Sequence, residues 1–116
     1  MNKLTLKFDL QDSVYNTAIR VVAGAVCMIN DEDMDDIEDF KVCVTESLLI
    51  FKSCGYESAE CAFSVENGTV CEIRGIGGTP VEGENNELSF ALIPALVKKC
   101  TIKKNGAVTE SIQLEM

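Results

Sequence analysis

The chain has 116 residues, of which 47% are hydrophobic and 25% charged, as expected for one globular domain with its own core. Its formal net charge of −9 argues against nucleic acid as a ligand, because proteins that bind nucleic acid need basic surfaces to neutralise phosphates. No apolar run approaches the roughly 20 residues that cross a bilayer, so we expect no membrane span.

The N-terminal segment, residues 3–9, alternates polar and apolar side chains. Leu4, Leu6 and Phe8 fall on one face at a period of two, which is typical of a half-buried strand. The segment has neither an uninterrupted apolar stretch nor a small-residue cleavage site, so we interpret it as a strand and not as a signal peptide. We therefore expect a cytoplasmic location.

A first helix is predicted after Asp12 or Ser13, because either side chain can cap its first turn. The apolar residues that follow are spaced by four, three, four and three, which fits one face of a helix. They are Tyr15, Ile19, Val22, Val26 and Ile29. Asn30 ends this pattern.

A second helix is predicted from the acidic segment to Gly55, which supplies a C-terminal stop. Seven of the nine residues from Asp31 to Asp39 are carboxylates, and acids favour the positive end of the helix dipole. The apolar stripe of this helix is Ile37, Phe40, Val44, Leu48 and Phe51.

From Ser58 onward the apolar period changes to two, which predicts strands. One hairpin is expected around Asn67-Gly68 and another around Asn105-Gly106. Between the hairpins lie a glycine cluster, an acidic loop and a third helix, residues 88–99. This order predicts a two-layer α/β sandwich, in which three helices cover one face of a mostly antiparallel five-stranded sheet. The whole chain, 1–116, is predicted to be one domain.

The six cysteines do not form a metal-binding pattern. No two of them are closer than seven residues, and histidine is absent. Since no export signal is recognised, we expect reduced, mostly buried thiols that pack as small apolar groups. No metal site is predicted.

Residues 19–54 resemble the anti-sigma-factor serine kinases of bacteria, which belong to the histidine-kinase-like (GHKL) ATPase superfamily. In that family an acidic D-x-I-E-D-hydrophobic-K segment precedes a helix with V-x-E, and here these are Asp36 to Lys41 and Val44-Thr45-Glu46. The resemblance implies the histidine-kinase-like ATPase fold with a shortened lid. It also implies a family activity in which ATP and Mg²⁺ serve to phosphorylate a serine of another protein.

The first catalytic box of the family, E-x-x-x-N-x-x-x-H, is incomplete in this chain. Glu46 stands where the family keeps its general base, and Ile50 replaces the asparagine that ligates Mg²⁺. Isoleucine offers no oxygen to a cation that requires oxygen ligands. Without the resemblance, Glu46 is a carboxylate on a helix flank, solvated or paired with Lys41 or Lys52.

The second box, D-x-G-x-G, aligns with the segment 74–78. The resemblance assigns Gly75, Gly77 and Gly78 to nucleotide-binding positions, but the aspartate that accepts a hydrogen bond from adenine is missing, and Arg74 can only donate. The lid segment, residues 79–87, has three acids and no basic residue. If the scaffold is intact, the double change Ile50→Asn with Gly75→Asp is expected to recover some nucleotide binding.

These losses favour a degenerate regulatory protein that acts through protein–protein binding, with kinase activity weak or absent and no cofactor. The resemblance implies a sigma factor or an anti-anti-sigma protein as partner, and also a homodimer. The alternative is an active ATP-dependent serine kinase with metal and adenine contacts rebuilt from residues such as Asn85 or Asn86. A third interpretation is a domain that binds a small ligand or anion with the glycine loop.

Overall fold

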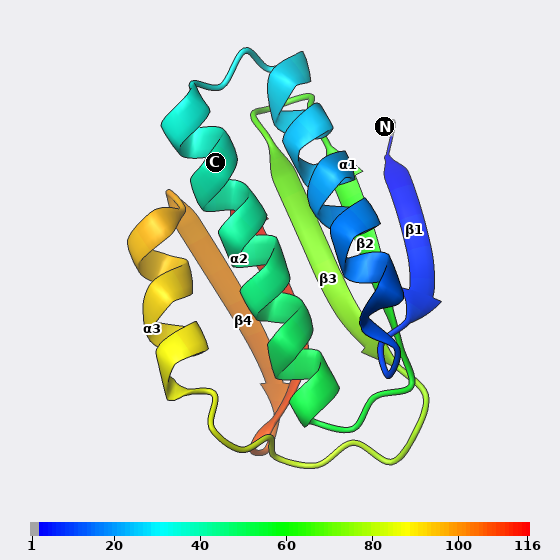
Figure 1. Cartoon of the computed structure of the whole chain (residues 1–116). Helices are drawn as coiled ribbons and strands as arrows, with labels where there is room; N and C mark the ends of the chain where they lie inside the picture. The colour runs from blue at the N-terminus through cyan, green and yellow to red at the C-terminus, as the bar shows by residue number, and fades with distance from the viewer. Residues whose placement is uncertain (1–2) are drawn as a thin grey trace.

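Five strands and three α-helices make up the computed structural model, which describes residues 3–116 (Figure 1). The order of the elements is the one predicted from the sequence, with a short 3-10 turn added before the first helix. The elements are β1 (Leu4–Asp9), η1 (Ser13–Tyr15), α1 (Asn16–Ile29), α2 (Met34–Ser53), β2 (Ser58–Ser64), β3 (Val70–Ile76), α3 (Glu87–Leu96), β4 (Lys99–Asn105) and β5 (Val108–Glu115).

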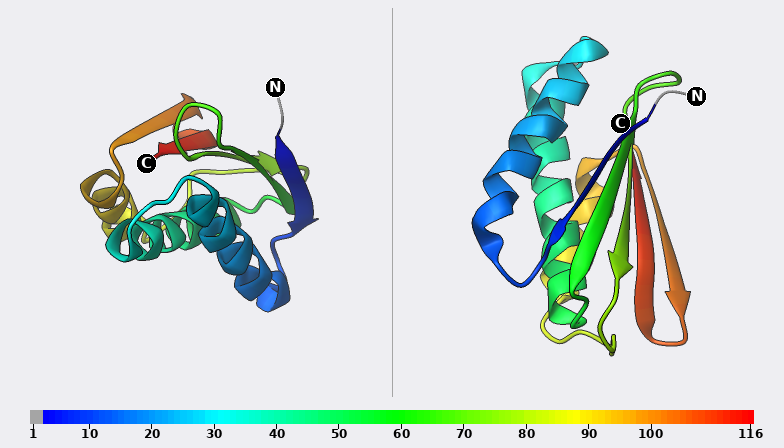
Figure 2. Two further views of the ribbon diagram at one scale, coloured as in Figure 1. Left: turned by 90° about the horizontal axis from the view of Figure 1, so that it is seen from above. Right: turned by 90° about the vertical axis from the view of Figure 1, so that its right-hand side faces the viewer.

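The sheet forms one layer and the helices form the other. The strands are arranged in the order β1-β2-β3-β5-β4, and each neighbouring pair is antiparallel, so β1 and β4 are the two edges. Figure 2 shows all three helices on the same face of the sheet. The predicted two-layer α/β sandwich is therefore confirmed.

The hydrophobic core lies between the helices and the sheet, and α2 supplies its centre. The apolar side of α2 packs against α1, α3, β3 and β5. Eight of its residues are buried over its whole length, so this helix is in contact with most of the molecule: Ile37, Phe40, Cys43, Val44, Ser47, Leu48, Ile50 and Phe51.

The predicted face of α1 is only partly right. Tyr15 and Ile29 are 51% and 67% exposed, and Leu4 of β1 is 48% exposed, so these three side chains lie outside the core. The buried residues of the helix are Ile19, Ala23, Gly24, Val26 and Cys27. Because α1 packs against α2 as well as against the sheet, its buried face is turned toward α2.

The acidic segment between α1 and α2 closes one helix and opens the next. The Glu32 N–H donates to the Cys27 carbonyl at 3.3 Å and the Asp31 N–H to the Met28 carbonyl at 3.2 Å, which is the pattern of a Schellman motif. Asp31 takes a left-handed φ of 52°. Asp33 then caps α2, because its Oδ1 accepts from the Asp36 N–H at 2.8 Å.

The third helix is shorter than predicted. It ends at Leu96, because the Lys98 N–H already donates to the Glu115 carbonyl at 3.0 Å and the chain enters β4 at Lys99. Residues 97–99, which were predicted to be helical, instead lead into β4, because pairing with β5 provides backbone hydrogen bonds from Lys98 onward. Pro94 lies inside α3, in its last turn.

We expect Asp31→Gly to stabilise the protein by about 0.5–1 kcal/mol, because glycine adopts the left-handed conformation without the steric cost that an L side chain meets. The change also removes an acid from the negative end of the α1 dipole. Urea denaturation measures the difference in the free energy of unfolding.

The matched control is Asp35→Gly, which removes the same charge from the first turn of α2, where the backbone is helical. Glycine inside a helix costs about 0.5–1 kcal/mol relative to alanine, so this variant is expected to lose stability. Equal effects of the two substitutions would show that charge, and not backbone conformation, is what matters at Asp31.

Candidate functional site

Glu46 joins two helices. It lies half-buried on α2, and its Oε2 accepts a hydrogen bond of 2.6 Å from the Oγ of the buried Ser89 on α3. Lys41, a suggested partner, instead places its Nζ 3.3 Å from Glu38 Oε1. Nothing in the sequence pointed to Ser89, because it is 43 residues away and belongs to no motif.

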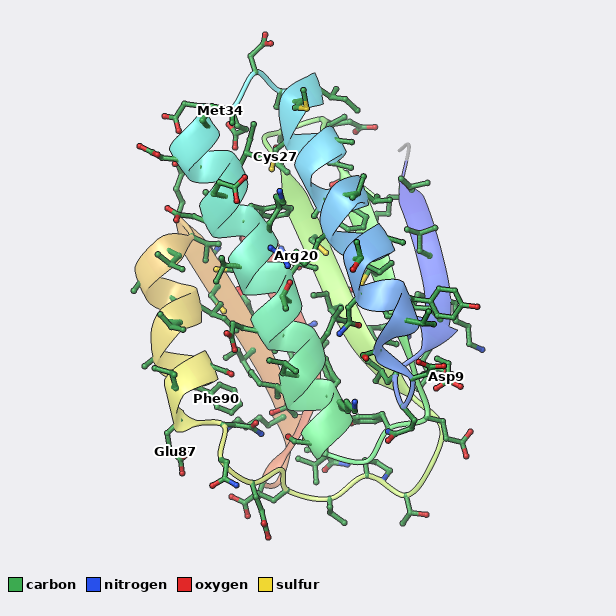
Figure 3. All side chains as sticks on the ribbon, in the orientation of Figure 1. Asp9, Arg20, Cys27, Met34, Glu87 and Phe90 are labelled. Carbon is green, nitrogen blue, oxygen red and sulfur yellow. The ribbon has the colours of Figure 1, made fainter. Side chains whose placement is uncertain are left out.

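The depression beside Glu46 is small. Its volume is about 150 Å³, and Arg20, Val42 and Thr45 line it together with Glu46. Figure 3 shows Arg20 projecting from α1 toward α2. Pockets that hold small molecules and cofactors have volumes of roughly 300–1,000 Å³, so this depression is too small to enclose a nucleotide.

The resemblance aligns Ile50 with the metal ligand of the first box and Cys54, four residues later, with its histidine, and both side chains lie in the core. Ile50 is 0% exposed and Cys54 is 2% exposed. Packing of α2 onto the sheet thus places the position of the metal ligand among apolar side chains. A hydrated cation has no access there, and no oxygen is offered to it.

The loop that corresponds to the lid is fastened onto the end of α2. The Val81 N–H donates to the Cys54 carbonyl at 2.9 Å, and the Asn86 Nδ2 donates to Ser53 Oγ at 2.7 Å. At Gly83 an added Cβ would collide with Ser53 Oγ, so the loop backbone lies directly on the helix. The loop therefore covers the C-terminal end of α2 in direct contact with it.

The glycines of the second box serve close packing. The ring of Tyr56 occupies the place of a side chain at Gly75: an added Cβ would lie 2.5 Å from its Cγ. Tyr56 cannot move aside easily, because its hydroxyl donates to the Thr109 carbonyl at 2.8 Å and its ring packs in an edge-to-face contact with the ring of Phe51. Gly77 and Gly78 form the tight turn after β3 with φ of 75° and 70°.

These contacts make it unfavourable to recover nucleotide binding with the double change Ile50→Asn and Gly75→Asp. Gly75→Asp would drive a side chain into Tyr56, and Ile50→Asn would place an amide at a fully buried position. An unpaired buried polar group costs about 1–3 kcal/mol. The double change would therefore disturb the fold before it restored a site.

A larger depression of about 330 Å³ lies beside Gly75 and gives the anion interpretation a location. Two cations, Arg74 and Lys103, and one acid, Glu110, are among its lining residues. However, Arg74 Nη2 donates to Glu60 Oε1 at 2.9 Å, so one of the two positive charges is already neutralised. The remaining charge balance gives an anion little advantage.

The buried thiols are held in their protonated form. Burial, and then the nearby carboxylates of Glu32 and Asp36, raises the pKa of Cys27 to about 12. Burial together with Asp39 raises the pKa of Cys43 to about 12 as well. Because the thiolate is the nucleophile, neither cysteine is activated for chemistry. Within residues 3–116, no group of three or more His, Cys, Asp or Glu side chains is placed to hold a metal ion.

Comparisons with known proteins return no family model and no curated sequence that matches the chain. Across residues 3–116, no helix combines the length and the apolar character that a membrane crossing requires. The functional argument therefore depends on the side chains described above. In chemical terms they form a helix junction around Glu46 and Ser89, a closed loop, and a set of packing glycines.

We expect Gly75→Ala to destabilise the protein by about 1–3 kcal/mol, the usual cost of overpacking a filled core. The cost is expected to fall by about 1 kcal/mol or more in a Tyr56→Leu background, because the ring that collides with the new methyl group is then absent. Urea denaturation of the four proteins gives this double-mutant cycle. Equal costs in both backgrounds would contradict the assigned contact.

The free energy of unfolding is expected to fall as the pH rises above about 9. In the unfolded chain a thiol loses its proton near its ordinary pKa of 9.0, whereas folded Cys27 and Cys43 keep theirs up to about 12. The unfolded state then binds fewer protons, so each thiol lowers stability by up to about 1.4 kcal/mol per pH unit in that window.

Urea denaturation at pH 8, 9.5 and 10.5 under reducing conditions measures this slope. Cys27→Ala is expected to reduce it, whatever the variant loses in absolute stability. If the slope stays the same in Cys27→Ala, the thiol does not titrate differently in the two states.

Proposed function

We propose that this chain is a regulatory protein that acts by binding another protein, on a scaffold like that of the anti-sigma-factor serine kinases, with its nucleotide site lost. The observation that carries the proposal is the arrangement at the first box. Glu46 is hydrogen-bonded to Ser89, Ile50 lies in the core, and the loop is fastened to the end of α2.

Each of these contacts opposes one step of phosphoryl transfer. A general base must be free to take a proton from the attacking hydroxyl, but the Glu46 carboxylate already accepts from a buried donor at 2.6 Å. Transfer also depends on a metal that neutralises the phosphate charge, and Ile50 cannot ligate one. The three acids of the loop add repulsion toward a triphosphate.

The partners that the resemblance implies are a sigma factor or an anti-anti-sigma protein in the cytoplasm, and not nucleic acid. The charge of the chain is consistent with a partner that presents a basic face. Acids are concentrated where α1 meets α2, and the whole chain carries a net charge of −9. Such a surface speeds association with a basic partner, and salt weakens the effect.

No nucleotide binding is expected. A thermal-shift titration with millimolar Mg-ATP and Mg-ADP should leave the melting temperature unchanged, whereas a ligand at 100 times its dissociation constant would add about 2.7 kcal/mol of stability. That gain corresponds to a rise of several degrees for a domain of this size. A rise with Mg-ATP, together with phosphate transfer to a protein serine that Glu46→Gln abolishes, would replace this proposal with the active-kinase alternative.

Binding without nucleotide is the positive test. Purified sigma factors and anti-anti-sigma proteins of the host are titrated with the chain in a calorimeter, at low and at high salt. We expect one of them to bind with no ATP present, and to bind more weakly at high salt because the acidic surface is then screened. If neither class binds under any condition, the regulatory proposal fails.

A further inference from the structure

Helix α1 has a second apolar face, which no other element in residues 3–116 covers. Beginning in η1, its outermost residues recur at intervals of four, three, four and three, and all five are exposed: Val14, Ala18, Val21, Ala25 and Met28. We call these five residues the α1 seam. The buried Ala23 is two residues from both Val21 and Ala25, and two residues correspond to about 200° around a helix, so the seam points away from the core. Its spacing is that of the two apolar positions in a heptad repeat, with which one helix packs along another.

Two depressions between α1 and β1 border the α1 seam. The larger, of about 540 Å³, is lined mostly by apolar residues: Leu6, Phe8, Tyr15, Ala18, Ile19 and Val22. The smaller, of about 300 Å³, lies farther along the same groove and has Leu4 and Ile29 in its lining. In Figure 1, α1 and β1 run next to each other along this side of the molecule. Each depression has room for a large apolar side chain, while the small side chains of Ala18 and Ala25 let another helix approach α1 closely.

The α1 seam carries its charge at one end. Within α1 the one charged residue is Arg20, so the helix itself is nearly neutral. Directly after the helix comes the acidic segment, in which Asp31, Asp33 and Asp35 are exposed. Among residues 3–116, none of these three carboxylates takes part in an ion pair, so their charge is available to a partner. The surface therefore combines an apolar face with one strongly negative end.

We propose that the α1 seam binds an amphipathic helix of another protein, which lies antiparallel to α1 and carries basic residues in its first turn. From Val14 to Met28 the seam is about 21 Å long, which matches a partner helix of about four turns. The antiparallel direction brings the N-terminus of the partner to the acidic segment. There the positive end of its helix dipole and its basic side chains both meet the aspartates. This inference rests on the proposed function, since it specifies where the regulatory partner is bound and by what kind of segment.

Charge distinguishes this occupant from others that could cover an apolar helix face. If the α1 helix of a second copy packed antiparallel on the seam, the acidic segment of each copy would lie beside Asp12 of the other, and a parallel copy would place the two acidic segments together. Neither arrangement brings a cation to the aspartates. An anionic membrane surface attracts basic segments, so the same aspartates oppose it. A helix with a basic first turn fits both the apolar face and its negative end.

Two synthetic peptides of about 18 residues, enough for the length of the seam, are the probes. Both have leucine at the two apolar positions of each heptad and the same overall composition, but one has its lysines in the first turn and the other in the last turn. Fluorescence anisotropy measures their binding to the full chain, and circular dichroism measures the helix that forms. We expect the peptide with lysines in its first turn to bind several-fold more tightly and to become helical, and we expect salt to reduce the difference.

A substitution in the middle of the α1 seam locates the site. Val21→Lys places a charge on the apolar face and is expected to raise the dissociation constant of the tighter peptide about tenfold or more. The matched control is Leu88→Lys on α3, because Leu88 is 70% exposed and Val21 is 64% exposed, and both variants change the net charge equally. The control is expected to bind as the unchanged chain does. Urea denaturation of both variants checks that neither substitution unfolds the protein.

The negative end of the seam is tested by neutralising two of its acids. The double variant Asp31→Asn with Asp35→Asn is expected to remove the preference for lysines in the first turn, and asparagine tolerates the left-handed backbone at position 31. The control, Glu82→Gln with Glu84→Gln, removes the same charge from exposed positions of the loop before α3 and is expected to keep the preference.

Three results would overturn the proposal: neither peptide binds, both bind equally well to the unchanged chain, or Leu88→Lys weakens binding as much as Val21→Lys. Failure of the regulatory function gives a different result. A sigma factor or anti-anti-sigma protein that binds Val21→Lys as tightly as the unchanged chain would reject the seam as the site and keep the regulatory function. Peptide binding that depends on Val21, with no binding of either partner class, would keep the seam and reject those partners. Sedimentation equilibrium covers the remaining occupant, since a dimer that Val21→Lys dissociates would assign the seam to a second copy.

Discussion

The burial of α2 along its whole length is the constraint on which the rest of this structure depends. This helix contacts α1, α3 and the two strands β3 and β5, so its orientation determines where the other two helices lie on the sheet. Its two flanks are tied by polar contacts, with Glu46 bonded to Ser89 on α3 and Ser53 bonded to the loop that precedes α3. Ile50 is fully buried on this helix, so it adds to the core and not to a ligand site.

Helix α1 differs from α2, because its contacts with α2 and the sheet leave several of its apolar side chains exposed. Ile19, Ala23 and Val26 are buried, while Val21, Met28 and Ile29 of the same helix are 64%, 67% and 67% exposed. A helix at the edge of a sheet has one neighbouring helix instead of two. Its outer face is not covered by the other described elements, although several of its side chains are apolar.

The sequence predicted most of the fold, because the apolar period changes clearly from helix to strand and two Asn-Gly turns mark the hairpins. It failed where two patterns give the same signal. The spacing places Tyr15 and Ile29 on one helical face with the buried Ile19 and Val26, because spacing alone does not tell which of two adjoining apolar faces is buried. At Gly75 the sequence alone does not show the packing contact, which depends on the ring of Tyr56 beside it. Ser89 was missed because a contact across 43 residues leaves no local pattern.

At position 50 a stable core requires an apolar side chain, whereas nucleotide chemistry requires a side chain that ligates a metal. An asparagine there would have to reach a metal and its waters, yet the site is fully enclosed by apolar side chains, and the loop is bonded to the end of the same helix. Leaving its amide unpaired would cost about 1–3 kcal/mol, a large part of the 5–15 kcal/mol that usually holds a domain together. Opening the loop to admit a ligand would in addition break its hydrogen bonds to Ser53 and Cys54. A site for ATP at this place would therefore need several coordinated changes, whereas binding a protein partner needs none of them.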